Sequence, residues 1–203
     1  MNQNLALQYQ PVAITVSRPS AIDIFAQLMV YATGLPNDDC FAKMLASQAI
    51  GSGILPIHLG LRKSVFAILF KRHFPGAELP KVSPMLVQTL NKTRLAERED
   101  LKMLLLEHRA GIDFSEVELA EIVAAACMGG NHLWQDLGLW SRTDVTQLIN
   151  QNFPTLAVKN IYNMKWKKFL YKQLCQQAGV YVCRAPSCEV CVDYVHCFGV
   201  EEG

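Results

Sequence analysis

The feature that most constrains this chain is a group of four cysteines near the C-terminus, Cys183, Cys188, Cys191 and Cys197. Their spacing is C-x4-C-x2-C-x5-C, so that one short segment supplies four thiols. The central C-x2-C turn lets two thiolates converge on one metal centre, and the outer cysteines then close a compact cage. Pro186 and the lack of a helical period favour an irregular loop that wraps a metal site.

Three chemistries compete for such a group of cysteines. The N-terminal sequence lacks the features of a secretory signal, so we expect a cytoplasmic protein, in which disulfides are rare. Zinc held by four cysteines is common, but zinc ribbons usually place a longer arm between two C-x2–4-C knuckles, and this tail has no such arm. The spacing therefore predicts a metal site, with an iron–sulfur or mixed-metal sulfur cluster preferred and zinc as the alternative.

Upstream of the cysteines, the apolar residues recur with the period of an α-helix. Hydrophobic residues make up 51% of the 203 residues and charged residues 18%, the balance of a globular chain. We predict an all-α fold with a single helical domain over residues 20–179, an extended arm over residues 1–19 and an irregular cysteine-rich loop over residues 180–203. The expected helices cover about 20–33, 38–48, 59–73, 83–108, 115–128, 131–137, 141–150 and 158–177.

The charge and hydropathy of the chain exclude two classes of function. The formal net charge is +1, whereas proteins that bind nucleic acids or membrane surfaces in general carry a clear basic excess. No apolar run approaches the length needed to cross a bilayer. We therefore expect neither a nucleic-acid partner nor a membrane.

Two local patterns in the middle of the chain make specific predictions. Ser115 and Glu118 form the S-x-x-E pattern of a capping box at a helix start. His132 and Asp136 are four residues apart, so they would share one helix face, where they form either a hydrogen-bonded pair or accessory metal ligands.

The last helix carries a basic stripe. At about 100° per residue, Lys165, Lys168 and Lys172 fall within one sector, with Cys175 just past its edge. This face is either simply solvated or attracts an anion or a partner, because thiolate-ligated clusters and oxyanions such as molybdate are negative. Arg184, inside the cysteine motif, would add to the attraction.

Two further residues are candidates for a place beside the cluster. Cys175 is either a buried helical thiol or an accessory sulfur ligand. His196 directly precedes Cys197, so it must lie near the cluster, either next to it or as a ligand.

Three stretches of this sequence resemble the NifQ family of nitrogen-fixation proteins. Residues 163–199, N-M-K-W-K-K-F-L-Y-K-Q-L-C followed by C-R-A-P-S-C-E-V-C-x-D-Y-x-x-C-F-G, resemble the C-terminus of that family. Residues 124–139, A-A-A-C-M-G-G-N-H-L-W-Q-D-L-G-L, are similar to its central motif, and H-F-P-G at residues 73–76 is similar to its N-terminal half. The resemblance spans most of the chain from about Leu59 onward, and the first 50 or so residues add nothing to it.

The resemblance implies a molybdenum carrier for the biosynthesis of the nitrogenase iron–molybdenum cofactor. Members of the family hold a molybdenum–iron–sulfur cluster on the C-x4-C-x2-C-x5-C motif and pass molybdenum to the cofactor-assembly scaffold complex together with the nitrogenase iron protein. The resemblance thus implies a metallochaperone and not an enzyme.

Two other functions fit the residues less well. One is an all-α protein whose iron–sulfur or zinc site is purely structural, which shares every sequence feature with a carrier. The other is an iron–sulfur DNA glycosylase of the helix–hairpin–helix type, which shares the C-x2-C-x5-C portion. The glycosylases have a first spacing of six and a hairpin before a catalytic lysine, and this chain has neither.

Overall fold

Within the residues it describes, 19–82, 94–179, 194–199 and 201, the computed structural model is all-helical and contains no β-strand. The predicted all-α class is confirmed, while the arm at residues 1–18 and residues 180–193 of the cysteine loop lie outside the described residues. None of the described helices is both long and apolar enough to span a membrane. The helices are α1 (Ala21–Met29), α2 (Asp38–Ile50), α3 (Lys63–His73), α4 (Leu95–Glu107), α5 (Ser115–Ala126), α6 (Leu133–Leu137), α7 (Arg142–Asn152), α8 (Pro154–Ala157), α9 (Trp166–Gln177) and α10 (Tyr194–Phe198), with a short 3-10 helix, η1, at Ile57–Gly60.

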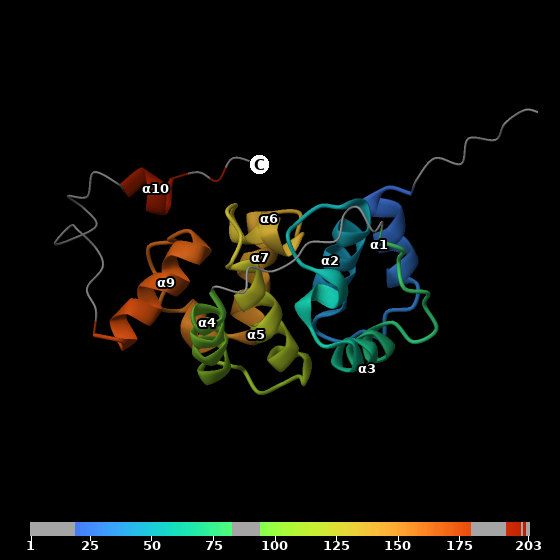
Figure 1. The fold of residues 1–203 in the computed structure, drawn as a ribbon, viewed down its shortest axis with the longest axis horizontal. Helices are drawn as coiled ribbons and strands as arrows, with labels where there is room; N and C mark the ends of the chain where they lie inside the picture. Colours follow the sequence, from blue (N-terminus) through green and yellow to red (C-terminus); the bar gives the residue numbers. More distant parts are fainter. Residues whose placement is uncertain (1–18, 83–93, 180–193, 200, 202–203) are drawn as a thin grey trace, which may run out of the picture.

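The helices are arranged in three groups along the long axis of the molecule. Figure 1 shows α1, α2 and α3 at one end, α4 to α7 in the middle, and α9 with α10 at the other end. Most of the central helix α5 is apolar, and residues 119–120 and 122–126 of it are fully buried. Such a helix needs neighbours all around it, and it packs against α4, α6 and η1.

Local signals place the start of α1 where the sequence predicts it. The Ser20 hydroxyl accepts a hydrogen bond from the Asp23 backbone N–H at 3.2 Å, and the Asp23 carboxylate accepts one from the Ser20 backbone N–H at 2.9 Å. The predicted helix 59–73 begins later, at Lys63, because His58 and Leu59 have φ values of 62° and 56°. Two consecutive residues in the left-handed region cannot extend a right-handed helix.

The predicted Ser115–Glu118 capping box is wrong. Ser115 is the first residue of α5, and its hydroxyl donates to Asp113 at 2.6 Å. Asp113 accepts from the Ser115 backbone N–H at 2.8 Å, and Glu116 accepts from the backbone N–H groups of residues 111–113 at 2.7–2.9 Å. These carboxylates, and not the Ser115 hydroxyl, provide the acceptors at this end of α5.

The predicted helix 158–177 is also wrong in its first half. The chain turns after α8, and α9 begins only at Trp166. Asn163 has a φ of 52°, and the Asn160 side chain accepts from the Met164 N–H at 2.8 Å and donates to the Met164 carbonyl at 2.9 Å. An asparagine turn of this kind competes with the helix. Lys165 therefore becomes the residue that precedes α9.

The tail is not irregular throughout. Its last part forms the five-residue helix α10, in which the Tyr194 and Phe198 rings stack with their centroids 4.5 Å apart. The prediction of an irregular loop over residues 180–203 is therefore wrong for residues 194–198, which are helical.

Candidate metal centre and the adjoining basic hollow

Of the four cysteines of the motif, only the last one lies among the described residues. Cys183, Cys188 and Cys191, like Arg184, lie outside the described residues, whereas Cys197 is a half-buried residue of α10. Within the described ranges, no group of three or more His, Cys, Asp or Glu side chains could hold a metal ion. The four thiolates of the motif remain the predicted ligand set, and their soft sulfur donors suit iron and reduced molybdenum.

Helix α10 is held at the start of α9. The Lys165 backbone N–H donates to the Cys197 carbonyl at 2.8 Å, and Lys165 Nζ lies 3.5 Å from the Val195 carbonyl oxygen. Figure 1 shows α10 next to the end of α9 that adjoins α6. The fourth cysteine of the motif is thus fixed at the N-terminal end of the lysine-rich helix.

A hollow of about 400 Å³ lies where three segments meet, namely the loop before α6, the first turn of α9 and the C-terminal segment with α10. The charged and titratable groups in its lining are His132, Lys165, Lys167, Lys168, His196 and Glu201. All of them except Glu201 are basic side chains. We call this space the basic hollow.

The structure divides the predicted lysine stripe. Lys165 and Lys168 line the basic hollow, but Lys172 lines a separate hollow of about 260 Å³ together with Lys159 and Phe198. The division follows from helix geometry, because Lys172 lies one turn beyond Lys168 and hence about 6 Å further along the axis.

The expected pair of His132 and Asp136 is replaced by another pair. Asp136 is fully buried and accepts from Lys167 Nζ and from the Asn131 backbone N–H, the latter at 3.1 Å. His132 precedes the first residue of α6 and has an extended backbone, so the i,i+4 geometry of a helix does not apply to it. Its Nδ1 lies instead 3.8 Å from Glu201 Oε1.

The Asp136–Lys167 ion pair anchors Lys167, which lines the basic hollow, to α6. Lys167 Nζ also donates to the Gly129 carbonyl at 3.1 Å, so that it joins α9 to both the glycine loop and α6. A Cβ built on Gly129 would overlap the Asp136 carboxylate. Gly129 is therefore required by this close approach. A role for Lys167 could not be predicted from the sequence, because its partner Asp136 lies 31 residues away along the chain.

A second set of contacts fixes α9 from the side of α4. The Arg94 guanidinium donates to the Tyr171 hydroxyl at 2.8 Å and to the Met128 carbonyl at 3.1 Å, and the Tyr171 hydroxyl donates to the Cys127 carbonyl at 3.3 Å. Together with the Lys167 contacts, these bonds hold α9 against α4 and α5. The N-terminal end of α9 is thus positioned at the basic hollow by rigid elements.

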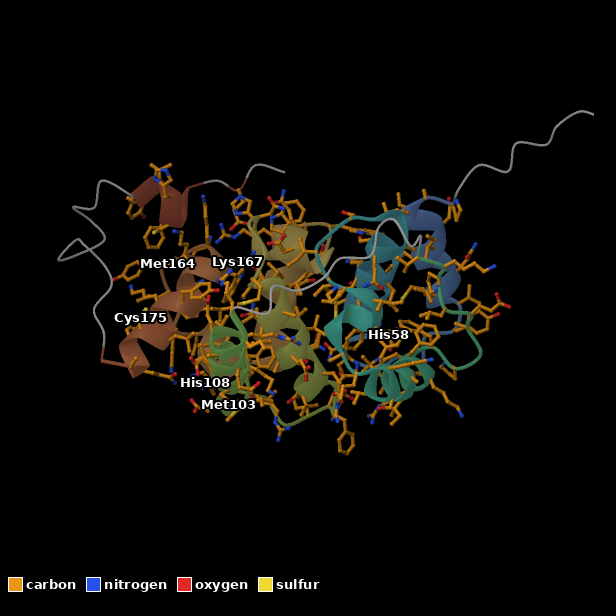
Figure 2. All side chains as sticks on the ribbon, in the orientation of Figure 1. His58, Met103, His108, Met164, Lys167 and Cys175 are labelled. Carbon is orange, nitrogen blue, oxygen red and sulfur yellow. The ribbon has the colours of Figure 1, made fainter. Side chains whose placement is uncertain are left out.

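Two of the three cysteines outside the motif, Cys127 and Cys175, lie in different environments. Cys127 is a core residue, 2% exposed, and burial raises the pKa of its thiol to about 12. Cys175 is partly exposed and lies on α9 ten residues after Lys165, or about 15 Å along the axis from the end that contacts Cys197. Figure 2 shows Cys175 and Lys167 at different levels of α9. In this arrangement, Cys175 and Cys197 cannot bind the same small cluster.

These environments predict a difference in thiol reactivity. In the metal-free protein at neutral pH, iodoacetamide should alkylate Cys175, while Cys127 should stay unmodified until denaturant is added, because only an accessible thiolate reacts. Mass spectrometry of the two peptides over time measures both rates. Equal rates for the two cysteines in the folded protein would show that Cys127 is not held in the core.

The comparison with known families assigns the chain. The model of the NifQ family matches residues 40–199, which include all four cysteines of the motif and every lining residue of the basic hollow except Glu201. The chain belongs to the NifQ family. This family is implicated in nitrogen fixation. The match begins at Cys40, earlier than the sequence resemblance from about Leu59 suggested.

Individual relatives of the NifQ family agree with the assignment. The chain is 48% identical over 168 residues to Protein NifQ of Azotobacter vinelandii, covering 78% of this chain and 86% of that protein. It is 35% identical over 173 residues to Protein NifQ of Klebsiella pneumoniae, covering 81% and 99%, and 37% identical over 158 residues to Protein NifQ of Rhodobacter capsulatus, covering 77% and 84%. No solved structure matches the chain significantly.

Proposed function

We propose that this chain carries molybdenum for the assembly of the nitrogenase iron–molybdenum cofactor. The cargo would be held in a molybdenum–iron–sulfur cluster on Cys183, Cys188, Cys191 and Cys197. The observation that carries the proposal is membership of the NifQ family, in a match that contains the complete four-cysteine motif. The proposed role is transport of a metal, so it needs no turnover of an organic substrate, and we propose that the protein is not an enzyme.

The chemistry of the described residues supports this role. Thiolate and sulfide are soft ligands that retain iron and reduced molybdenum well. Cys197 lies in a short helix near the surface, not in the apolar core, where α5 and its neighbours lie. A ligand in such a place can be reached by an acceptor without unfolding of the domain. Arg184 and the cations of the basic hollow would favour a negative cluster or oxyanion nearby.

The proposed partners are the cofactor-assembly scaffold complex and the nitrogenase iron protein, in the cytoplasm. The second hollow is suited to such contacts, because Ile161 and Tyr162 beside it are 75% and 69% exposed. Lys159 and Lys172 border these apolar side chains. An apolar centre with charged neighbours is the usual anatomy of a protein interface. We therefore propose a role for Lys172 in attracting a partner, not the anion.

Elemental analysis of anaerobically purified protein tests the proposal against its main alternative. A carrier should contain molybdenum together with iron when iron, sulfide and molybdate are supplied. A purely structural cluster would contain iron alone, and a structural zinc site would contain zinc alone. Either of these two results, in protein that was supplied with molybdate, would reject the carrier function while leaving the helical fold intact.

A further inference from the structure

The basic hollow combines three lysine side chains and two imidazoles in one concave space. Lys165, Lys167 and Lys168 come from the start of α9, His132 from the residue before α6, and His196 from α10. Lys167 already neutralises the buried Asp136. Lys165 and Lys168 therefore supply net positive charge to the hollow, and the half-buried Lys165 does so next to the segment that carries Cys197.

The backbone of α9 adds to this charge. The hollow is lined by Trp166, Lys167 and Lys168, the first three residues of this twelve-residue helix. The aligned peptide dipoles place a partial positive charge at that end, and the first backbone N–H groups of a helix point away from it. Lysine side chains and a helix N-terminus in one concavity form a combination that favours an anion with several oxygens.

A carboxylate of the chain already occupies part of this space. Glu201 lines the hollow, its side chain is only 4% exposed, and Oε1 lies 3.8 Å from His132 Nδ1 and 3.6 Å from Arg142 Nη1. A carboxylate is normally buried only where cations compensate for the loss of water. The position of Glu201 thus indicates, independently of the lysines, that the side of the hollow next to His132 and Arg142 stabilises a negative oxygen atom.

We propose that the basic hollow is a binding site for a tetrahedral oxyanion and that Glu201 is its internal competitor. The volume of about 400 Å³ leaves room for such an anion beside the Glu201 carboxylate. The site is inferred from the described residues alone. Only the identity of the anion rests on the proposed function, from which we infer that the anion is molybdate. An anion bound here lies next to His196 and hence beside Cys197, so the hollow gathers the oxyanion at the border of the cysteine motif.

Anion binding to the metal-free, full-length protein tests this site directly. Isothermal titration calorimetry with molybdate, tungstate, sulfate and phosphate at low ionic strength should show binding of at least molybdate and tungstate. The double variant Lys165→Gln/Lys168→Gln should bind about 10-fold more weakly or worse, because two nearby positive charges are lost. Glu201→Gln should bind several-fold more tightly, because a competing negative charge is removed.

Lys172→Gln is the matched control. It removes the same charge from the same helix but lies at the second hollow, so its affinity for the anion should stay within about 2-fold of the wild type. Circular dichroism on all variants checks that the helices are retained. The proposal is overturned if none of the four anions binds, if the double variant binds like the wild type, or if Lys172→Gln loses as much affinity as the double variant.

Failure of this site and failure of the carrier function are separate results. Protein that takes up molybdenum on reconstitution but shows no calorimetric binding of an oxyanion would reject the site alone. Protein that binds molybdate in the basic hollow but carries no molybdenum after reconstitution with iron and sulfide would reject the carrier function alone.

Discussion

The Cys191→Ala variant is expected to lose the iron–sulfur cluster and to contain almost no iron or molybdenum. Cys191 belongs to the central C-x2-C turn, in which two thiolates bind one metal centre, and alanine offers no ligand in its place. Anaerobic reconstitution followed by elemental analysis and electron paramagnetic resonance measures the loss. The helical domain should survive, because the buried apolar residues of its core lie between Ile24 and Leu170, outside the segment that carries Cys191.

Cys175→Ala is the control for this experiment. It removes one sulfur from the same protein, but from the level of α9 that is far from Cys197, so its cluster signal should equal that of the wild type. A normal cluster in Cys191→Ala would show that the metal is bound elsewhere in the chain. Loss of the cluster in Cys175→Ala would show that α9 and the motif are arranged differently when metal is present.

The second large effect is expected on stability, at the Asp136–Lys167 pair. Lys167→Met should leave the fully buried Asp136 carboxylate without its cation, and this should lower the free energy of unfolding by about 3 kcal/mol or more. Asp136→Asn should cost a similar amount, because the Lys167 ammonium, with only 14% of its side chain exposed, loses its countercharge. Urea unfolding followed by circular dichroism gives both values.

The double variant Lys167→Met/Asp136→Asn separates the ion pair from the packing. Because no uncompensated charge remains in it, its loss of stability should be clearly smaller than the sum of the two single losses. Lys168→Met, at the exposed neighbouring position, should change the free energy of unfolding by less than about 0.5 kcal/mol. Additive losses in the double variant would mean that the two residues do not interact.

The parts of the fold that follow from short-range signals could be predicted from the sequence. The helices after Ser20 and Ser141 begin as expected, because in each case the serine hydroxyl accepts a hydrogen bond from a backbone N–H three residues later. Helix α2 ends at Ile50, two residues after the predicted end, where Gly51 has a φ of 85°. These features depend on neighbouring residues alone, so a single sequence contains the information.

The predictions at helix starts are wrong where two local signals compete. At the start of α5, the acceptors of Asp113 and Glu116 take the place of the predicted Ser115 cap. Before α9, the left-handed Asn163 interrupts a stretch whose apolar period is helical throughout. The periodicity shows which face is buried, but it does not show where a side-chain hydrogen bond replaces the helical one.

Only the cysteine ligands of the candidate site and the basic face beside them could be predicted from the sequence. The cysteine spacing indicated a metal centre, and Lys165 and Lys168 indicated a basic face beside it. The hollow itself is formed by segments that are distant in the sequence, and the Asp136–Lys167 ion pair beside it joins residues of two different helices. No periodic pattern relates such residues, so the exclusion of Lys172 and the inclusion of Glu201 required the structure.

Transfer of the metal tests the central claim most directly. Protein loaded anaerobically with iron, sulfide and molybdate is freed of unbound metal and mixed with the cofactor-assembly scaffold complex and the iron protein, and molybdenum is then quantified in each separated component. The account predicts that molybdenum leaves this chain and appears in the scaffold complex, and that Cys191→Ala delivers none. Molybdenum that stays on this chain, or a scaffold complex that receives as much from the Cys191→Ala variant, would contradict a molybdenum carrier.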